Sequence, residues 1–195
     1  MAATARIRIQ GQDLRRVRML AACPKESPVV VMNSPRANSP QQPPPAAVAS
    51  LLRICALLNK HEAQYVIAGG YACILHGLVR TTEDVDVLIA ESSENYQRVI
   101  AALAEMEDHA ARELTPQDLA ENVVVKVADE VEVDVSRRAW KVSFADAAPR
   151  ARVVEISGVR IPYLSLRDLI ASKETYREQD RADLERLRLL AAEEK

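Results

Sequence analysis

The sequence predicts a small mixed sheet flanked by helices, an α/β (α+β) fold, and three observations lead to this prediction. From residue 46 onward, apolar residues with helical spacing alternate with short β-rich stretches. Two pairs of β-rich stretches enclose short polar turns, which is typical of hairpins. The chain then closes on two further helical stretches. At 195 residues it can bury one sizeable core and still carry an extension.

Residues 1–46 are predicted to form a disordered, basic, proline-rich tail, and residues 47–192 the folded domain. Seven of the ten prolines lie between Pro24 and Pro45, a composition that cannot pack a core. Residues 1–47 carry a net charge of +5 in a chain of −2, so the remainder carries −7. The tail is either an arginine-rich arm for nucleic acid or a dispensable extension. The lack of aromatic residues among its basic residues favours the extension.

The elements follow in order from residue 46. An apolar stripe predicts a helix that ends near His61, and β-rich composition predicts a strand over 65–68. Gly77 is placed to cap a short helix over 71–76. Further patterns predict a strand over 84–89, a helix over 93–105 and hairpins at 123–127 with 131–135 and at 153–156 with 159–161. The closing helices are expected over about 165–176 and 180–192, the latter as a solvated helix with surface ion pairs.

The most informative stretch joins two adjacent glycines to a pair of aspartates. Gly69 and Gly70 end the first predicted strand, where glycine lets the backbone approach a phosphate at a helix N-terminus. Asp84 and Asp86 lie two apart in the next strand and therefore share one face. Paired carboxylates beside a phosphate cradle suit Mg²⁺ bridged to a nucleotide.

A third carboxylate is expected on a neighbouring strand, because two-metal phosphoryl transfer places two ions between several acidic groups. The stretch from Val131 to Val135 supplies Glu132 and Asp134 on one face, with valines on the other. Either acid can serve. The alternative is an exposed strand face without function, since polar residues alternate on any half-buried strand.

Glycine-glycine, a short helix, Arg-Thr-Thr and then Asp-Val-Asp resembles the signature of the DNA polymerase beta-type nucleotidyltransferases. The resemblance is strongest to their small stand-alone members, which include the AbiEii-like toxins and minimal nucleotidyltransferases. It covers about residues 46–190 and implies the fold of that superfamily, with Asp84, Asp86 and Asp134 as metal ligands and catalytic residues for two Mg²⁺ ions, or Mn²⁺ in their place. The family pattern selects Asp134 over Glu132.

The resemblance also implies a nucleotide site. The amides of Gly69, Gly70 and Tyr71 would cradle phosphates, because Gly70 stands where many relatives carry a serine whose hydroxyl helps to hold the triphosphate. Arg80 and Thr82 match an Arg-Thr pair before the aspartates; Arg80 could bind a phosphate or pair with a neighbouring acid. Lys173 matches a lysine that faces the phosphates of the nucleotide. Arg177, Asp180 and Asp183 also match relatives but are interpreted as residues of a solvated helix.

The function that follows is transfer of an NMP from an NTP to a hydroxyl on RNA (tRNA in particular), on a protein or on a small molecule. Similar proteins often form one half of a toxin–antitoxin or phage-defence pair, so a cognate toxin or antitoxin is an expected partner. The alternative is a catalytically weak or inactive antitoxin or protein-binding module, and a less favoured one is an antibiotic-modifying enzyme.

Composition also bears on cellular location, on zinc and membrane sites and on nucleic-acid binding. The three cysteines lack CxxC spacing, which favours a reducing, cytoplasmic location and argues against a zinc site. No apolar run approaches the roughly 18–20 residues that span a bilayer, so no membrane partner is expected. The acidic domain is not an obvious nucleic-acid clamp, and a polynucleotide substrate would need a local basic patch. Trp140 and the few other aromatic residues indicate no base-stacking platform.

Overall fold

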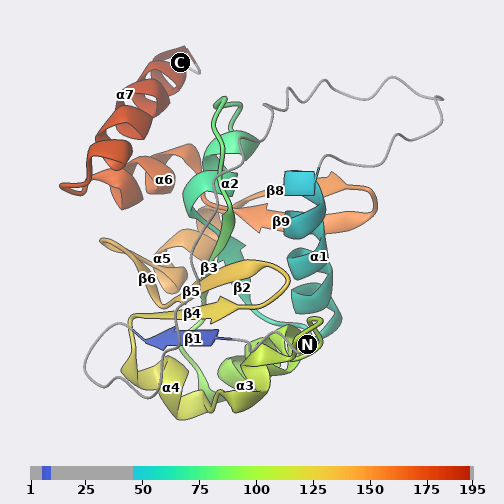
Figure 1. Ribbon diagram of the computed structural model, residues 1–195. Coiled ribbons are helices and arrows are strands. Elements are labelled where there is room, and N and C mark those ends of the chain that lie inside the picture. The colour runs from blue at the N-terminus through green and yellow to red at the C-terminus, as the bar shows by residue number, and fades with distance from the viewer. Residues whose placement is uncertain (1–5, 10–45, 194–195) are drawn as a thin grey trace.

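A seven-stranded sheet with helices on both faces forms the centre of the computed structural model, which describes residues 6–9 and 46–193 (Figure 1). The strands of this sheet are β1 (Arg6–Ile9), β2 (Tyr65–Ile67), β3 (Asp84–Ile89), β4 (Val124–Ala128), β5 (Glu132–Ser136), β8 (Arg152–Ile156) and β9 (Val159–Tyr163). A two-stranded hairpin is formed by β6 (Arg138–Ala139) and β7 (Val142–Ser143). The helices are α1 (Ala46–Lys60), α2 (Gly69–Leu75), α3 (Ser93–Leu103), α4 (Pro116–Glu121), α5 (Phe144–Ala147), α6 (Leu166–Lys173) and α7 (Glu178–Glu193), with 3₁₀ turns η1 (Ala110–Glu113) and η2 (Ala148–Arg150).

The strand order is β1-β4-β5-β3-β2-β9-β8, and the sheet is mixed. β3 pairs in parallel with β5, and β2 pairs in parallel with β9, whereas the other neighbours are antiparallel. Both predicted hairpins are present, as β4–β5 and β8–β9. The predicted fold class, a mixed sheet flanked by helices, is therefore confirmed.

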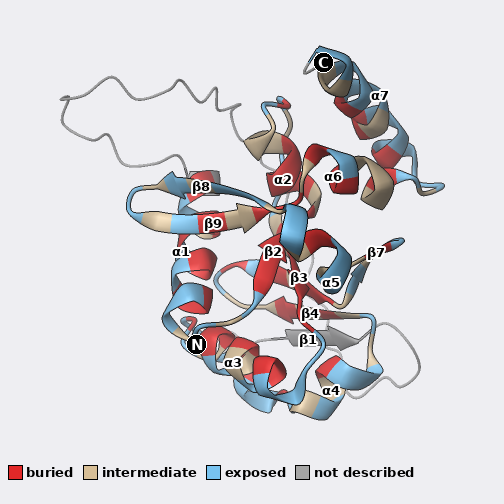
Figure 2. Cartoon of the chain, turned by 180° about the vertical axis from the view of Figure 1, so that it is seen from behind, coloured by how far each residue is buried: buried red, intermediate tan, exposed pale blue. Residues whose placement is uncertain are grey.

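The two faces of the sheet carry different side chains. Val85, Val87 and Ile89 of β3 are at most 1 % exposed and join α1, α3 and α4 in the larger hydrophobic core. A smaller core on the other side packs α2, α5, α6 and α7 against residues such as Val66 and Leu88. Figure 2 shows buried residues concentrated at the sheet and on the inward sides of these helices. The face opposite the larger core is free to carry the polar residues of β3, β4 and β5.

The predicted helices form with their expected signals. Ser92 caps α3 by accepting a hydrogen bond from the amide of Asn95, and Ser165 caps α6 in the same way. Gly77 follows α2 with a φ of +90°, its amide donates to Ile74 and the amide of Leu78 donates to Cys73. This pattern is a Schellman motif, which needs a residue in the left-handed conformation. α2 begins two residues earlier than predicted and includes both glycines.

One strand lies within the segment predicted to be a tail. Residues 6–9, Arg-Ile-Arg-Ile, form β1 and pair antiparallel with β4, from Arg6 opposite Ala128 to Ile9 opposite Val125. The prediction of a structureless tail is wrong for these four residues, because alternating β-branched residues suit pairing with an open strand edge. The rest of the predicted tail, including its proline-rich part, lies outside the described residues.

None of the helices in the described part of the chain combines the length and hydrophobicity that crossing a bilayer requires.

Candidate active site

Three aspartates converge on the polar face of the sheet. Asp84 and Asp86 project from β3, and Asp134 projects from β5, where the parallel register sets it directly beside Asp86. Each of the three carboxylates offers an oxygen, and these oxygens lie within 4.8 Å of one another. The valines between them point into the larger core, so burial of one face fixes the direction of the carboxylates.

The two candidates for the third carboxylate lie in different positions. Glu132 pairs with Asp84 in the register of the sheet, but its side chain is 45 % exposed and forms an ion pair with Lys126. Asp134 is the acid whose carboxylate joins the cluster. The structure therefore groups Asp134, rather than Glu132, with Asp84 and Asp86.

Burial and mutual repulsion perturb this cluster. Burial, with the nearby carboxylates of Asp84 and Asp134, raises the pKa of Asp86 from 3.8 to about 6. Burial likewise raises the pKa of Asp134, although the Lys126 ammonium opposes the shift. Asp134 Oδ1 is buried and accepts no hydrogen bond from the described residues; Lys126 Nζ lies 3.2 Å away in an ion pair that is not aligned as a hydrogen bond.

These features fit a divalent metal ion. Clustered carboxylate oxygens are the donors that Mg²⁺ and Mn²⁺ prefer, and a cation would remove the repulsion that raises the pKa of Asp86. The unsatisfied oxygen of Asp134 gives such an ion a ligand that makes no other hydrogen bond. Asp84, Asp86 and Asp134 could thus hold the metal that a phosphoryl-transfer enzyme needs.

The two glycines lie against the acids and leave no room for side chains. Gly69 has a φ of +55°, and a Cβ there would lie 1.7 Å from Asp86 Oδ2. A Cβ on Gly70 would lie 2.3 Å from Thr82 Oγ1. The Gly70 amide donates a hydrogen bond to the Asp86 carboxylate, which lowers the pKa of Asp86 and partly offsets the effect of burial. The amide expected to face a phosphate is thus engaged with a candidate metal ligand.

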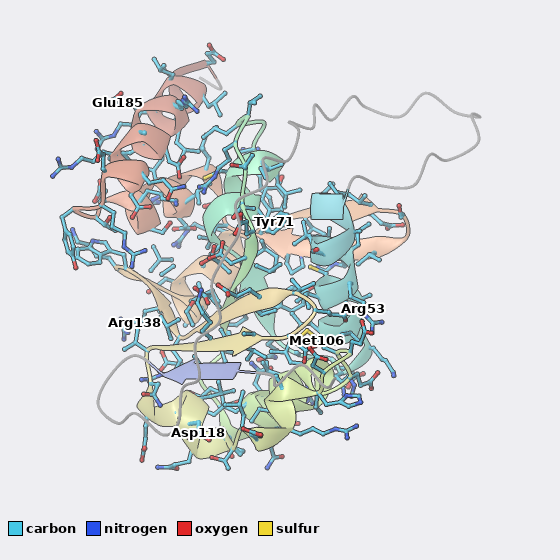
Figure 3. All side chains as sticks on the ribbon, in the orientation of Figure 1. Arg53, Tyr71, Met106, Asp118, Arg138 and Glu185 are labelled. Carbon is cyan, nitrogen blue, oxygen red and sulfur yellow. The ribbon has the colours of Figure 1, made fainter. Side chains whose placement is uncertain are left out.

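Two more of the predicted nucleotide-binding residues contact the acids. Thr82 Oγ1 donates a hydrogen bond to Asp84 Oδ1 at 3.1 Å and so orients that carboxylate. Tyr71, in the first turn of α2, is 2 % exposed. Burial, followed by the charge of Asp84, raises the pKa of the Tyr71 phenol to about 12. Figure 3 shows Tyr71 on α2 above the sheet, near the centre of the molecule. Both residues lie beside Asp84, as the resemblance implies for a nucleotide site.

Arg80 and Lys173 belong to a buried network of charges between the glycine-containing segment and the C-terminal helices. Arg80 Nη1 lies 2.6 Å from Asp183 Oδ2, and Lys173 Nζ lies 2.9 Å from Asp180 Oδ1 and 3.1 Å from Asp183 Oδ2. Arg80 therefore pairs with Asp183 and not with Glu83 or Asp84, its neighbours in the sequence. Lys173 also lowers the pKa of Asp86. Its charge therefore acts on the aspartate cluster even while the network holds its ammonium.

The interpretation of Asp180 and Asp183 as members of a solvated helix is wrong. Both are buried, with 8 % and 5 % of their surfaces exposed, whereas Arg177 in the same segment is exposed as expected. Asp183 pairs with Arg80, about a hundred positions earlier in the chain, and Asp180 pairs with Lys173 of the preceding helix. Spacing within α7 alone therefore carried no signal of their burial. From sequence alone, acidic residues on a helix rich in charged residues are expected at the surface, because acidic side chains are seldom buried without a partner.

Sequence reasoning also missed Lys126. This lysine on β4 faces Asp134 across the antiparallel hairpin and forms ion pairs with both Asp134 and Glu132. A signal was present, because a tight turn near Asp129 sets the register of β4 and β5 and places residues 126 and 134 opposite each other. Lys126 provides the positive charge closest to the third carboxylate among the described residues.

The chain is similar to proteins described as nucleotidyltransferases. Residues 49–192 match a family described as "Nucleotidyltransferase of unknown function (DUF6036)". A solved structure of a protein from Thermotoga maritima, described as a candidate nucleotidyltransferase, is similar at 18 % identity with a TM-score of 0.46; the match covers 75 % of this chain and 92 % of that one. No protein of curated function matches the chain.

Proposed function

The chain belongs to this family of nucleotidyltransferases, and from that premise we propose that it is a Mg²⁺-dependent enzyme. It would transfer an NMP from an NTP to a hydroxyl group on RNA, tRNA in particular, or on a protein. The observation that carries the proposal is the convergence of Asp84, Asp86 and Asp134, with one unsatisfied oxygen, beside a glycine-containing helix start. Function rests here on the site, because the fold alone does not determine the chemistry.

In the proposed reaction, the acceptor hydroxyl oxygen bonds to the α-phosphorus, the bond from that phosphorus to the bridging oxygen of pyrophosphate breaks, and pyrophosphate leaves. Asp84, Asp86 and Asp134 would hold two metal ions, which supply the charge neutralisation that phosphoryl transfer requires. Asp134 would also accept the hydroxyl proton. The amides of Gly69 and Tyr71 in the first turn of α2 would bind phosphate oxygens, because a helix N-terminus favours anions. The Gly70 amide already donates to Asp86.

In the proposed reaction, Lys173 and Thr82 assist the three aspartates. The Lys173 ammonium is close enough to influence Asp86 and would add positive charge on the phosphate side of the cluster. The Thr82 hydroxyl holds Asp84 in position. It also occupies the space into which a side chain at position 70 would project. We propose that this hydroxyl lies on the nucleotide side of the site.

The test is incubation with each α-³²P-labelled NTP and Mg²⁺, offering total RNA, purified tRNA and cell extract as acceptors. We expect label to enter an acceptor with the wild type. The variant Asp84→Asn/Asp86→Asn should lose at least about 1,000-fold of that activity, because the metal ions supply several kcal/mol and 1.36 kcal/mol corresponds to tenfold.

The matched control is Glu107→Gln/Glu113→Gln, which removes two exposed carboxylates between α3 and α4 and should leave the activity unchanged. Label that enters the acceptor equally with the aspartate variant would overturn the proposal. Absence of label in every lane, together with absence of NTP binding, would favour an antitoxin or another protein-binding module without turnover.

A further inference from the structure

Two exposed aromatic side chains from distant segments of the chain meet at the surface. Trp140 is at the tip of the β6–β7 hairpin, and Tyr176 lies in the loop between α6 and α7. Their rings make an edge-to-face contact with centroids 6.0 Å apart. They remain 46 % and 78 % exposed, so the contact leaves ring faces open to solvent. Tyr176 is also the most exposed of the large hydrophobic residues described in the chain.

The turn between β6 and β7 and a polar contact hold this arrangement. Trp140 has a φ of +58°, the sign that a two-residue hairpin loop requires at its first central residue. Lys141 Nζ lies 3.9 Å from Glu174 Oε2, so a polar contact joins the same hairpin and loop next to the rings.

Each aromatic residue closely follows a residue of the proposed site. Tyr176 is three positions after Lys173, so their Cα atoms are at most about 11 Å apart. Trp140 is six positions after Asp134, which limits that separation to about 20 Å. The hairpin continues from the strand that carries Asp134, the residue to which the proposed reaction assigns the proton of the acceptor hydroxyl.

The charge around the rings fits a phosphodiester backbone. Arg138 and Arg177 are both exposed, and neither forms an ion pair within the described part of the chain. Residues 137–141 contain Arg137, Arg138 and Lys141 and no acidic residue. Figure 3 shows Arg138 on the hairpin, at the opposite side of the molecule from Arg53 of α1. The hairpin side of the aromatic pair is therefore basic, whereas Tyr176 and Arg177 lie between Glu174 and Glu178 in the chain.

We propose that Trp140 and Tyr176 form a stacking site for a base of a single-stranded nucleic-acid acceptor, with Arg138 and Arg177 contacting its phosphates. Base faces stack on exposed aromatic rings without regard to sequence, and flanking cations follow the backbone. The inference rests on the proposed function, because it assigns the acceptor of that reaction. It also replaces the expectation that the chain offers no aromatic platform for a base.

Trp140 is the chain's single tryptophan, so its fluorescence reports on this site directly. A short unstructured RNA oligonucleotide should quench that fluorescence in a saturable way, whereas an NTP with Mg²⁺ should not. Tyr176→Ala should weaken RNA binding about 5- to 150-fold, the effect of losing one stacked base. Arg138→Gln/Arg177→Gln should reduce the dependence of affinity on salt, since fewer phosphates are neutralised.

The matched control is Leu189→Ala, which truncates another exposed apolar side chain, 67 % exposed on α7, and should leave RNA affinity unchanged. Trp140→Phe, measured by anisotropy of labelled RNA, should retain binding because a ring remains. Quenching by NTP alone would assign the rings to the nucleotide and overturn the inference. Absence of quenching by either probe would also overturn it.

Failure of the inference and failure of the proposed function can be told apart. RNA binding at Trp140 should persist in Asp84→Asn/Asp86→Asn, because binding requires no turnover. If wild-type protein binds RNA there but transfers no nucleotide, the proposed function fails alone. If it transfers nucleotide to RNA equally well in Tyr176→Ala and Trp140→Ala, the inference fails alone.

Discussion

Two charged clusters lie on either side of α2, and they are built on opposite principles. In the cluster of Asp84, Asp86 and Asp134, like charges crowd together and one buried oxygen accepts no hydrogen bond. In the network of Arg80, Lys173, Asp180 and Asp183, two cations and two anions neutralise one another at 2.6–3.1 Å. The balanced network is a structural device that fixes α6 and α7. The unbalanced cluster sets three carboxylates against the single ammonium of Lys126 and could hold a divalent ion as well.

The pKa values of the aspartates shift in opposite directions in the two clusters. Burial raises the pKa of Asp86 to about 6, and its neighbours Asp84 and Asp134 add to the shift. At Asp180 burial acts in the same direction, but hydrogen bonds from Thr175 and Lys173 outweigh it and the pKa falls below its ordinary value. The charged carboxylate is therefore destabilised in one cluster and stabilised in the other. Asp-to-Asn substitutions should then have effects of opposite sign on stability.

The largest effect is expected from Asp183→Asn in the balanced network. This change leaves Arg80 and Lys173, both nearly buried, without one of their anions. Breaking a buried pair by removing one partner costs about 3–5 kcal/mol. Urea unfolding of the metal-free protein should show a loss of this size. Glu94→Gln, which breaks the exposed pair with Arg98, serves as control and should change stability by less than about 0.5 kcal/mol.

An effect of opposite sign is expected from Asp86→Asn in the unbalanced cluster. The folded-state pKa of about 6 lies above the ordinary 3.8, so the folded protein binds a proton more readily than the unfolded chain. Stability of the wild type should therefore fall as pH rises from about 4 to about 6 and lose up to about 3 kcal/mol. Asparagine carries no charge, so the variant should be more stable than wild type at pH 8 in EDTA. Thermal unfolding of both proteins across this pH range measures the difference in stability. A variant less stable than wild type at pH 8 would contradict the expected opposite signs in the two clusters.

The smallest effect is expected from Lys126→Met, which removes the cation closest to Asp134. The Lys126 side chain is 27 % exposed, so its loss should change the stability of the metal-free protein by less than about 1 kcal/mol. Mg²⁺ should instead bind more tightly, because it no longer competes with an ammonium for Asp134. The Mg²⁺ concentration needed to raise Tm should fall. An unchanged or higher requirement would show that Lys126 does not oppose metal binding.

Much of the fold could be predicted from sequence because one face of each strand is buried. Alternation in β3 and β5 predicted both the strands and the shared direction of Asp84, Asp86 and Asp134, since a strand with one apolar face has no other register. Gly77 marked the end of α2 by local chemistry alone. The short α4 and the β6–β7 hairpin escaped prediction, because elements of a few residues carry too little periodicity to stand out.

The remaining parts of the site depend on contacts between distant segments. Helical spacing could place Asp180 and Asp183 on α7, but their burial comes from packing against Lys173 and Arg80, which lie on other segments. Trp140 and Tyr176 were read separately, as sparse aromatic residues, because their segments are joined only in the folded structure. Burial of a polar group and convergence of exposed side chains are tertiary properties, and a pattern within one element does not contain them.

The register of β3 and β5 has a kinetic consequence. Asp86 and Asp134 are neighbours in the sheet but lie 48 positions apart in the chain. Closing so long a loop costs chain entropy before the strands gain from pairing, so the carboxylates remain separate, weak ligands until the sheet has formed. A divalent ion would then have no assembled binding site during collapse. It would bind only after the sheet has formed, so it would slow unfolding without speeding folding.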